Sequence, residues 1–201
     1  IIGWRGEPGV KDEPQHITQG ELTLPLLDTM HVPYAIIDET WEQQLDNAIR
    51  YIHEHNGRYA LIVRKGTFCE PNITTEYSQQ PLPLSREEAI TSIIKHTNTN
   101  DKIVATTGMI SRELFELREH QHAGHANDFL TVGGMGHASQ IALTIALQHP
   151  EQRIWCLDGD GAVLMHMGGM AIIANSEANN LVHVVLNNGA HDSVGGQPTV
   201  G

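Results

Sequence analysis

Hydrophobic residues in the second half of the chain alternate between short apolar runs and longer stretches with helical periodicity. The runs predict strands over residues 103–106, 130–132, 153–157 and 183–187. The longer stretches predict helices over residues 86–97, 111–120, 135–149 and 167–178. Strand–helix alternation of this kind predicts an α/β fold with doubly wound parallel sheets and helices on both faces, in which ligands bind beyond the carboxyl ends of the strands.

The first half of the chain predicts fewer elements. Residues 1–20 are rich in Gly, Pro and charge and predict a loop that follows a short strand at Ile1-Ile2. The pattern then predicts a helix near residues 19–30, a strand over 32–38, and a helix that Thr40-x-x-Gln43 opens as a capping box and Gly57 ends. A strand over residues 59–64 completes this half.

The composition shifts to Pro, Gln, Ser and Thr between Glu70 and Pro83, as in a linker between two packed units. We therefore place a domain boundary near residue 80 and expect two domains, 1–80 and 81–201. After the linker, Ser85-x-x-Glu88 is a capping box that predicts the start of the helix over 86–97. The chain begins without Met and stops directly after a candidate ligand-binding segment, so we expect both domains to be truncated.

Charge and hydropathy exclude two kinds of partner. The chain has 24 acidic against 12 basic side chains, a formal charge of −12, and nucleic-acid binding depends mainly on neutralising phosphates. Its longest apolar runs are strand-sized, far short of the roughly 20 residues of a membrane span. Cys69 and Cys156 match neither a metal nor a thioredoxin spacing, which favours reduced thiols in a cytoplasmic protein.

Two segments at predicted strand ends carry the most specific chemistry. In Gly159-Asp160-Gly161 the glycines permit close backbone approach to a phosphate, and Asp160 offers the hard oxygen that Mg²⁺ prefers. In the second segment, Asn188 offers a neutral oxygen and Ala190 a backbone carbonyl. Each segment alone is also typical of an ordinary turn, but the pair at this spacing favours a site for a magnesium diphosphate.

A glycine-rich segment, Gly133-Gly134-Met135-Gly136-His137, also follows a predicted strand and precedes a helix. Free amide groups and the helix dipole favour an anion at such a place. The segment does not match Gly-x-Gly-x-x-Gly, which disfavours a nicotinamide cofactor. We expect it to lie at the same edge of the sheet as Thr107-Gly108, which follows an earlier strand.

These segments resemble a known superfamily. Gly159-Asp160-Gly161 with Asn187-Asn188 resembles the motif that binds thiamine diphosphate and magnesium, and Gly134-Met135-Gly136 is similar to the preceding loop of that superfamily. Within it, the chain resembles the phosphonopyruvate decarboxylase family over nearly its whole length. The sulfopyruvate decarboxylases share much of the same pattern. Further segments that carry the resemblance are residues 2–16, 63–68, 106–108, 111–116, 136–139 and 191–197.

The resemblance implies roles for the matching residues. Asp160, Asn188 and the Ala190 carbonyl would bind Mg²⁺, and Met135 would be the bulky residue that bends the cofactor. His191 and Asp192 directly follow the magnesium segment and are candidates for acid/base catalysis, because His exchanges protons near neutral pH. The alternative is that Asp192 stabilises a turn and His191 only binds a phosphate. The other implied cofactor-binding residues are Thr107, Gly108, Gly134, Gly136, His137, Gly159, Gly161, Ala162, Asn188 and His191.

The implied reaction is the non-oxidative decarboxylation of 3-phosphonopyruvate to phosphonoacetaldehyde and CO2, a step of phosphonate biosynthesis. Arg5, Lys11 and Arg112 are candidates for pairing the phosphonate charge. In this superfamily the active site forms between a pyrimidine-binding domain and a diphosphate-binding domain of different chains. Residues 1–80 would then be the trailing part of the first and 81–201 most of the second, in a homo-oligomer. The activating glutamate of the family would lie upstream of Ile1, leaving this chain alone catalytically incomplete.

Three other interpretations are compatible with the sequence. The protein could decarboxylate sulfopyruvate, or it could be a noncatalytic module that has kept the fold. It could also be a zinc hydrolase that uses the histidines of residues 120–125. His53 and His55 are poor co-ligands, because positions i and i+2 of a helix point to different sides.

Overall fold

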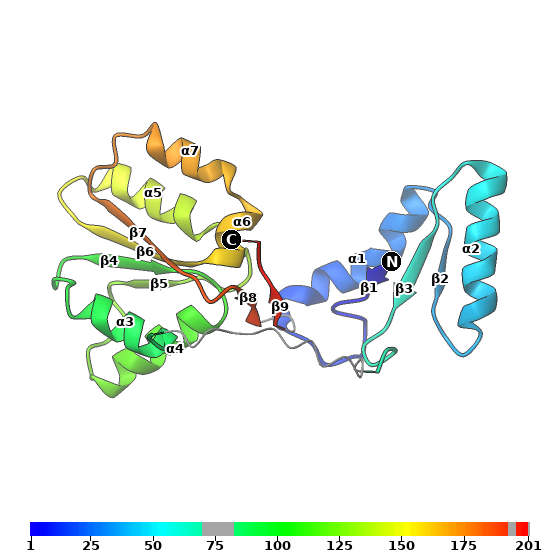
Figure 1. Cartoon of the computed structure of the whole chain (residues 1–201), viewed down its shortest axis with the longest axis horizontal. Coiled ribbons are helices and arrows are strands. Elements are labelled where there is room, and N and C mark those ends of the chain that lie inside the picture. The colour runs from blue at the N-terminus through cyan, green and yellow to red at the C-terminus, as the bar shows by residue number, and fades with distance from the viewer. Residues whose placement is uncertain (70–82, 193–195, 201) are drawn as a thin grey trace. The chain divides into compact units, whose positions relative to one another are not determined.

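The computed structural model describes residues 1–69, 83–192 and 196–200. Residues 70–82 of the predicted linker, with the boundary near residue 80, fall outside these ranges. The chain divides into two units, Ile1–Tyr77 and Ser78–Gly201. Each unit contains its own parallel sheet (Figure 1). No helix in the described ranges is both long and apolar enough to cross a membrane.

Unit 1 is a three-stranded parallel sheet with strand order β1-β3-β2. Its elements are β1 (Ile2–Gly3), the 3-10 helix η1 (Pro14–His16), α1 (Ile17–Thr29), β2 (Tyr34–Ile36), α2 (Trp41–His55) and β3 (Ala60–Val63). Leu27 of α1 packs on Ala60 and Ile62 of β3, and these three residues form the core of the unit. The predicted elements of this half are present.

Both ends of α2 differ from their predicted form. Thr40 is the N-cap residue, but its side chain makes no capping bond; its hydroxyl donates instead to Asp38 Oδ1 at 2.6 Å. The helix ends at Asn56, which has a φ of 46°, one residue before Gly57. Asn adopts this left-handed conformation more readily than most residues, because its short polar side chain bonds locally. The predicted capping box is therefore wrong, and the predicted end is close.

Asp12 organises the loop that precedes α1. Its carboxylate accepts two bonds from the Arg5 guanidinium, at 2.9 and 2.7 Å, and lies 2.9 Å from His16 Nδ1. It also accepts the backbone N–H groups of Gly6 and Glu13, at 2.8 and 2.7 Å. The Arg5 and His16 bonds, followed by those two N–H groups, hold the pKa of the Asp12 carboxyl well below its usual range.

Asp12→Asn is expected to destabilise unit 1, and to do so less at acidic pH. Because the folded-state pKa is depressed, the charged carboxylate contributes its full stabilisation above the unfolded-state pKa of about 3.9, and this contribution is lost as pH falls below that value. Urea unfolding of both proteins at several pH values checks this. The gap between their midpoints should be constant above about pH 5 and shrink below about pH 4. A gap that does not change with pH would contradict the account.

Unit 2 contains a four-stranded parallel sheet, in the order β5-β4-β6-β7, and a short antiparallel hairpin. Its elements are α3 (Arg86–Ile94), β4 (Lys102–Ala105), α4 (Met109–His120), β5 (Asp128–Leu130), α5 (Ala138–Gln148), β6 (Ile154–Gly159), α6 (Asp160–Met165), α7 (Gly168–Ala174), β7 (Leu181–Leu186), β8 (Ala190–His191) and β9 (Gln197–Pro198).

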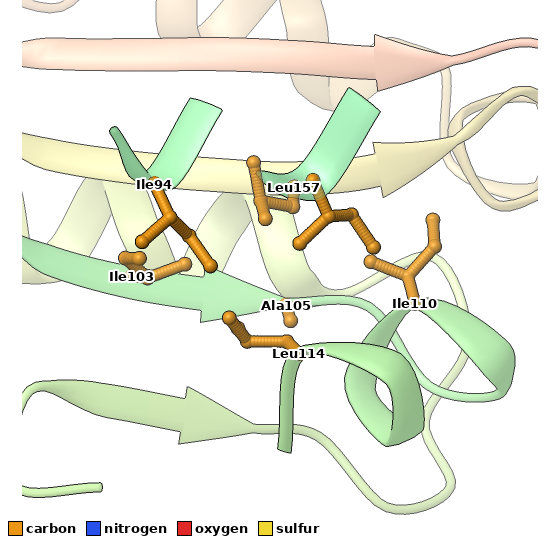
Figure 2. Packing of buried hydrophobic residues seen from close by; sticks show 7 residues of the cluster. Ile94, Ile103, Ala105, Ile110, Leu114 and Leu157 are labelled. Atoms are coloured by element: carbon orange, nitrogen blue, oxygen red, sulfur yellow. The ribbon is translucent and has the colours of Figure 1, made fainter. Parts of the chain in front are cut away.

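Successive side chains of β4 and β6 point to opposite sides of the sheet. Because these side chains are apolar on both sides, helices cover both faces. On one face, residues of α3 and α4 pack against these strands (Figure 2); the cluster consists of Ile90, Ile94, Ile103, Ala105, Ile110, Leu114 and Leu157. On the other face α5 packs against the same strands; that cluster consists of Val104, Ala138, Ala142, Ala146, Ile154 and Cys156. The predicted α/β fold, with parallel sheets and helices on both faces, is confirmed.

Leu114 belongs to the first cluster and is fully buried. Leu114→Ala is expected to lower the free energy of unfolding by about 2–5 kcal/mol, because it removes apolar contacts and leaves a cavity. Leu147 of α5 is 51% exposed and provides a matched control, with a loss of about 0.5 kcal/mol or less expected for Leu147→Ala. Chemical denaturation measures both, and equal losses would contradict this packing.

Several predicted elements of unit 2 have different bounds, and three of these differences bear on the site. The helix predicted from residue 135 starts at Ala138, because Gly133, Gly134 and Gly136 have φ values of 69°, 59° and 87°. The helix predicted over 167–178 is present as α7 but ends at Ala174, and an additional helix that was not predicted, α6, begins at Asp160, directly after β6. The strand predicted over 130–132 lies two residues earlier. The hairpin of β8 and β9 was not predicted.

Candidate cofactor site

The strand order of unit 2 creates an opening at the carboxyl ends of β4 and β6. From β4 the chain continues to β5 on one side, and then returns to β6 on the other side of β4. Loops that leave two neighbouring parallel strands in opposite directions leave a crevice between them. A pocket of about 290 Å³ lies at this point. The sheet topology therefore explains why the pocket forms where the glycine-rich segments meet.

Most of the predicted site residues line this pocket. They are Thr107, Met135, Gly159, Asp160, Gly161, Ala162, Asn188, Ala190, His191 and Asp192. The described lining does not include Gly108, Gly134, Gly136 or His137. Segments far apart in the sequence thus meet at one edge of the sheet.

The four remaining residues shape the neighbouring loops. Gly108 is the N-cap of α4 and has a φ of 98°. At Gly136 a Cβ atom would lie 3.0 Å from the carbonyl oxygen of Ala162, so a side chain there would press on α6. His137 Nδ1 lies 3.0 Å from the carbonyl oxygen of Gly134, and its ring packs edge-on against His166. Contact of these residues with a cofactor stays a prediction.

Asp160 lies at the first position of α6 and is buried. Its Oδ2 accepts a bond from the hydroxyl of Thr199 at 2.5 Å. Thr199 is held by a second bond, from its N–H to the carbonyl oxygen of Gly189 at 2.9 Å. A carboxylate has about four acceptor positions, so the bond from Thr199, the side-chain bond that Asp160 makes within the described ranges, leaves capacity for a cation. Thr199 was not predicted, because its place depends on the hairpin of β8 and β9.

Asn188 and Ala190 bring two more oxygens to the pocket. Asn188 Oδ1 accepts the N–H of Ala190 at 3.1 Å and has a second lone pair. Ala190 lies opposite Pro198 in the hairpin, and the bond from the Thr199 N–H to the Gly189 carbonyl makes this a non-hydrogen-bonded pair, in which the Ala190 carbonyl points away from β9. One carboxylate and two neutral oxygens are a ligand set that suits Mg²⁺.

Thr106 marks the pocket as a site for an anionic ligand. Its hydroxyl is buried, and it has no hydrogen-bond partner among the described residues. The residue lines the same pocket. Buried hydroxyls are nearly always paired, so a ligand oxygen would satisfy this one. The first turn of α4 follows, and its N–H groups favour negative charge. The donors present therefore fit a diphosphate.

Thr107 and Gly161 hold neighbouring segments of the pocket close together. The Thr107 hydroxyl accepts the N–H of Gly133 at 3.2 Å, which ties the loop after β4 to the loop after β5. A Cβ atom at Gly161 would lie 2.6 Å from His191 Nδ1. Gly161 therefore allows the imidazole of His191 to lie against the start of α6.

Arg86 is a cationic residue of the described pocket lining and was not predicted. Its Nε and Nη2 donate to Glu113 at 2.9 and 2.8 Å, and its Nη1 lies 3.4 Å from Asp192 Oδ2. These carboxylates, Glu113 first, raise the pKa of Arg86 above its usual range. None of the predicted phosphonate partners is in the described lining of this pocket, and their role stays a prediction. Arg5 binds Asp12 in unit 1, Lys11 is also in unit 1, and Arg112 is not part of the described lining.

The zinc interpretation finds no support in the ranges that the structure describes. Within them, the group of three potential ligands that lie close together is Cys156, Asp158 and His183, away from the predicted loop. His183 Nε2 lies 3.2 Å from Asp158 Oδ2, which is the geometry of a hydrogen bond. Burial, followed by the charge of Asp158, raises the pKa of the Cys156 thiol and disfavours the thiolate that binds metals. His125 is bonded to Glu119 instead.

Comparison with known proteins identifies a family that matches the part of the chain containing most of this pocket. Residues 106–201 match the family described as thiamine pyrophosphate enzyme, C-terminal TPP binding domain. The whole chain is 34% identical to phosphonopyruvate decarboxylase of Streptomyces viridochromogenes and 30% identical to that of Streptomyces hygroscopicus, and covers 53% of each. Sulfopyruvate decarboxylase subunit beta of Methanocaldococcus jannaschii is 32% identical over 57% of this chain and 57% of that protein.

The chain thus spans about half the length of the phosphonopyruvate decarboxylases that it matches. The matched C-terminal domain covers the strand ends and loops that form most of the pocket. Residues 106–201 therefore form a C-terminal thiamine pyrophosphate (thiamine diphosphate) binding domain, and the chain is similar over its whole length to phosphonopyruvate decarboxylases.

Proposed function

We propose that the protein acts as a decarboxylase of 3-phosphonopyruvate, with thiamine diphosphate and Mg²⁺ as cofactors, and forms phosphonoacetaldehyde and CO2. The observation that carries this proposal is one pocket that combines the oxygens of Asp160, Asn188 and Ala190 with the buried hydroxyl of Thr106, which has no partner among the described residues. It lies largely in a domain that matches thiamine pyrophosphate enzymes. The substrate is proposed from the phosphonopyruvate decarboxylases that align with the whole chain.

Several residues of the pocket have roles in this proposal. When bound, thiamine diphosphate supplies the electron sink that a 2-keto acid needs to lose CO2. Asp160, Asn188 and the Ala190 carbonyl hold Mg²⁺, and Thr106 donates to the diphosphate together with the first N–H groups of α4. Met135 lines the pocket as an apolar wall, and we propose it as the residue against which the cofactor bends.

His191 is the proposed group for holding and moving a proton. Its ring lies against Gly161 at the pocket edge, and imidazole exchanges protons near neutral pH. Asp192 already accepts a bond from Asn188 and lies beside the Arg86 guanidinium. A carboxylate so occupied suits an electrostatic role better than proton transfer.

The assembly and location are further parts of the proposal. Unit 1 is assigned to the pyrimidine-binding domain and unit 2 to the diphosphate-binding domain, in a homo-oligomer whose active site lies between chains. The name of the similar archaeal proteins, sulfopyruvate decarboxylase subunit beta, supports an assembly of more than one chain. The free thiols of Cys69 and Cys156 suit a cytoplasmic location.

Turnover by the intact protein tests the function. With thiamine diphosphate and Mg²⁺ present, CO2 release from phosphonopyruvate, sulfopyruvate and pyruvate is measured side by side. We expect the highest kcat/KM for phosphonopyruvate, with phosphonoacetaldehyde as product. Turnover of sulfopyruvate alone would support the second candidate, which the similarity to sulfopyruvate decarboxylases favours. Cofactor binding without turnover of any keto acid would indicate a noncatalytic module.

A further inference from the structure

A continuous row of polar contacts leads from α4 to Asn188. Glu113 of α4 binds the Nε and Nη2 of Arg86 at 2.9 and 2.8 Å. The remaining Nη1 of Arg86 lies 3.4 Å from Asp192 Oδ2. The same Asp192 oxygen accepts the side-chain Nδ2 of Asn188 at 2.6 Å. Four side chains from α3, α4 and the segment after β7 are thus linked in series.

The contacts at the end of this row fix the orientation of the Asn188 amide. An ionised carboxylate only accepts hydrogen bonds, so the amide atom that faces Asp192 must be the nitrogen. A backbone N–H only donates, so the atom 3.1 Å from the N–H of Ala190 must be the oxygen. Both neighbours select the same orientation, which places Oδ1 on the side of the Ala190 backbone.

The rest of the row holds Asp192 in place. The side chain of Asp192 is 50% exposed, so it would be free to change rotamer without a partner. Arg86 is itself fixed, because both contacts to Glu113 are direct hydrogen bonds in a two-pronged geometry that Lys cannot copy. It also starts α3 next to Ser85, whose capping box with Glu88 has bonds of 2.8 and 3.2 Å.

We propose that Glu113, Arg86 and Asp192 are positioning residues that hold the side-chain oxygen of Asn188 toward a divalent cation bound with the cofactor. This inference rests on the proposed function, because it assumes the cation at Asn188. The row differs from the cation ligands themselves, since none of its first three residues supplies an oxygen to the ion. Removing these contacts should weaken the binding of the cation more than the binding of the diphosphate.

Binding of thiamine diphosphate to the intact protein, titrated with Mg²⁺, tests the inference. Arg86→Gln and Asp192→Ala are each expected to raise the Mg²⁺ concentration for half-maximal binding about 10-fold, because the amide then samples other rotamers. The double variant should show no larger rise than either single variant, since the residues act in series. Asp192→Asn keeps an acceptor oxygen and should recover most of the wild-type response. At saturating Mg²⁺, affinity for thiamine diphosphate should stay within about 3-fold.

Arg118→Gln is the matched control. Arg118 also binds a carboxylate with two bonds, at 2.9 and 3.1 Å to Asp128, but it is not part of the described pocket lining. It should leave the Mg²⁺ response unchanged, and thermal unfolding shows that each variant is folded. Wild-type responses in Arg86→Gln and Asp192→Ala, additive effects, or an equal rise in Arg118→Gln would overturn the inference. Absence of Mg²⁺-dependent binding in the wild type would instead refute the proposed function.

Discussion

Asp160→Ala is expected to reduce the Mg²⁺-dependent affinity for thiamine diphosphate roughly 100-fold or more. Asp160 is the carboxylate among the three proposed cation ligands, and it is buried at the start of α6. Removing a group that only supports a metal ligand reduces the affinity for the metal about 10- to 100-fold. Removing a charged ligand itself should therefore reduce that affinity by at least about 100-fold. Equilibrium dialysis with and without Mg²⁺ measures the effect.

Two further variants make this result specific. Asp160→Asn keeps the size and one neutral oxygen, and should bind more weakly than the wild type but more tightly than Asp160→Ala. Asp46 is an exposed residue of α2, and Asp46→Ala should bind like the wild type. Circular dichroism shows whether each variant is folded. A folded Asp160→Ala protein that binds within about 3-fold of the wild type would rule out Asp160 as a cation ligand.

Gly20→Ala is expected to destabilise unit 1 by at least about 3 kcal/mol, although the same change stabilises an ordinary exposed helix by about 0.5–1 kcal/mol. Gly20 lies inside α1, and a Cβ atom there would lie 1.8 Å from the carbonyl oxygen of Gly6. The atoms that this Cβ would meet belong to the backbone of Gly6, so the clash cannot be relieved by rotating a side chain. Urea unfolding followed by tryptophan fluorescence measures the change, since Trp4 Nε1 donates to the Gly20 carbonyl at 2.9 Å.

Gly168→Ala provides the helical control. Gly168 is the first residue of α7, and a Cβ atom there would have no heavy atom within 4 Å. This variant should have the stability of the wild type or slightly more. If Gly20→Ala were as stable as Gly168→Ala, the close approach of α1 to the loop at Gly6 would be wrong.

The sequence predicts those parts of the fold that depend on local patterns. Apolar runs and helical periodicity locate the strands of the larger sheet, because a strand buried between two helical layers has to be apolar. The capping box of Ser85 and Glu88 is present as predicted. At Asp160 and Asn188, glycine and polar residues follow a strand directly. That arrangement identifies loops at the carboxyl edge of a parallel sheet before their contacts are known.

Other features depend on contacts between distant segments and leave little local signal. Arg86 is a helix-starting residue after a linker, and its importance arises from Glu113 and Asp192, which are 27 and 106 residues away. Thr106 differs from Thr107 in that its hydroxyl is buried and has no partner among the described residues. From the sequence alone, Gly20 is only an unfavourable helix residue. In the structure, the backbone at Gly6 lies so close that no side chain fits at this position. In each case tertiary packing, rather than local propensity, decides the role.

Calorimetric titration of the intact protein with thiamine diphosphate, with and without Mg²⁺, tests the central claim most directly. The account predicts binding that requires Mg²⁺, because the diphosphate and the oxygens of Asp160, Asn188 and Ala190 share one cation. It also predicts that Asp160→Ala loses the tight binding that Mg²⁺ supports. Absence of binding in the presence of Mg²⁺, or binding equally tight without a divalent cation, would contradict it.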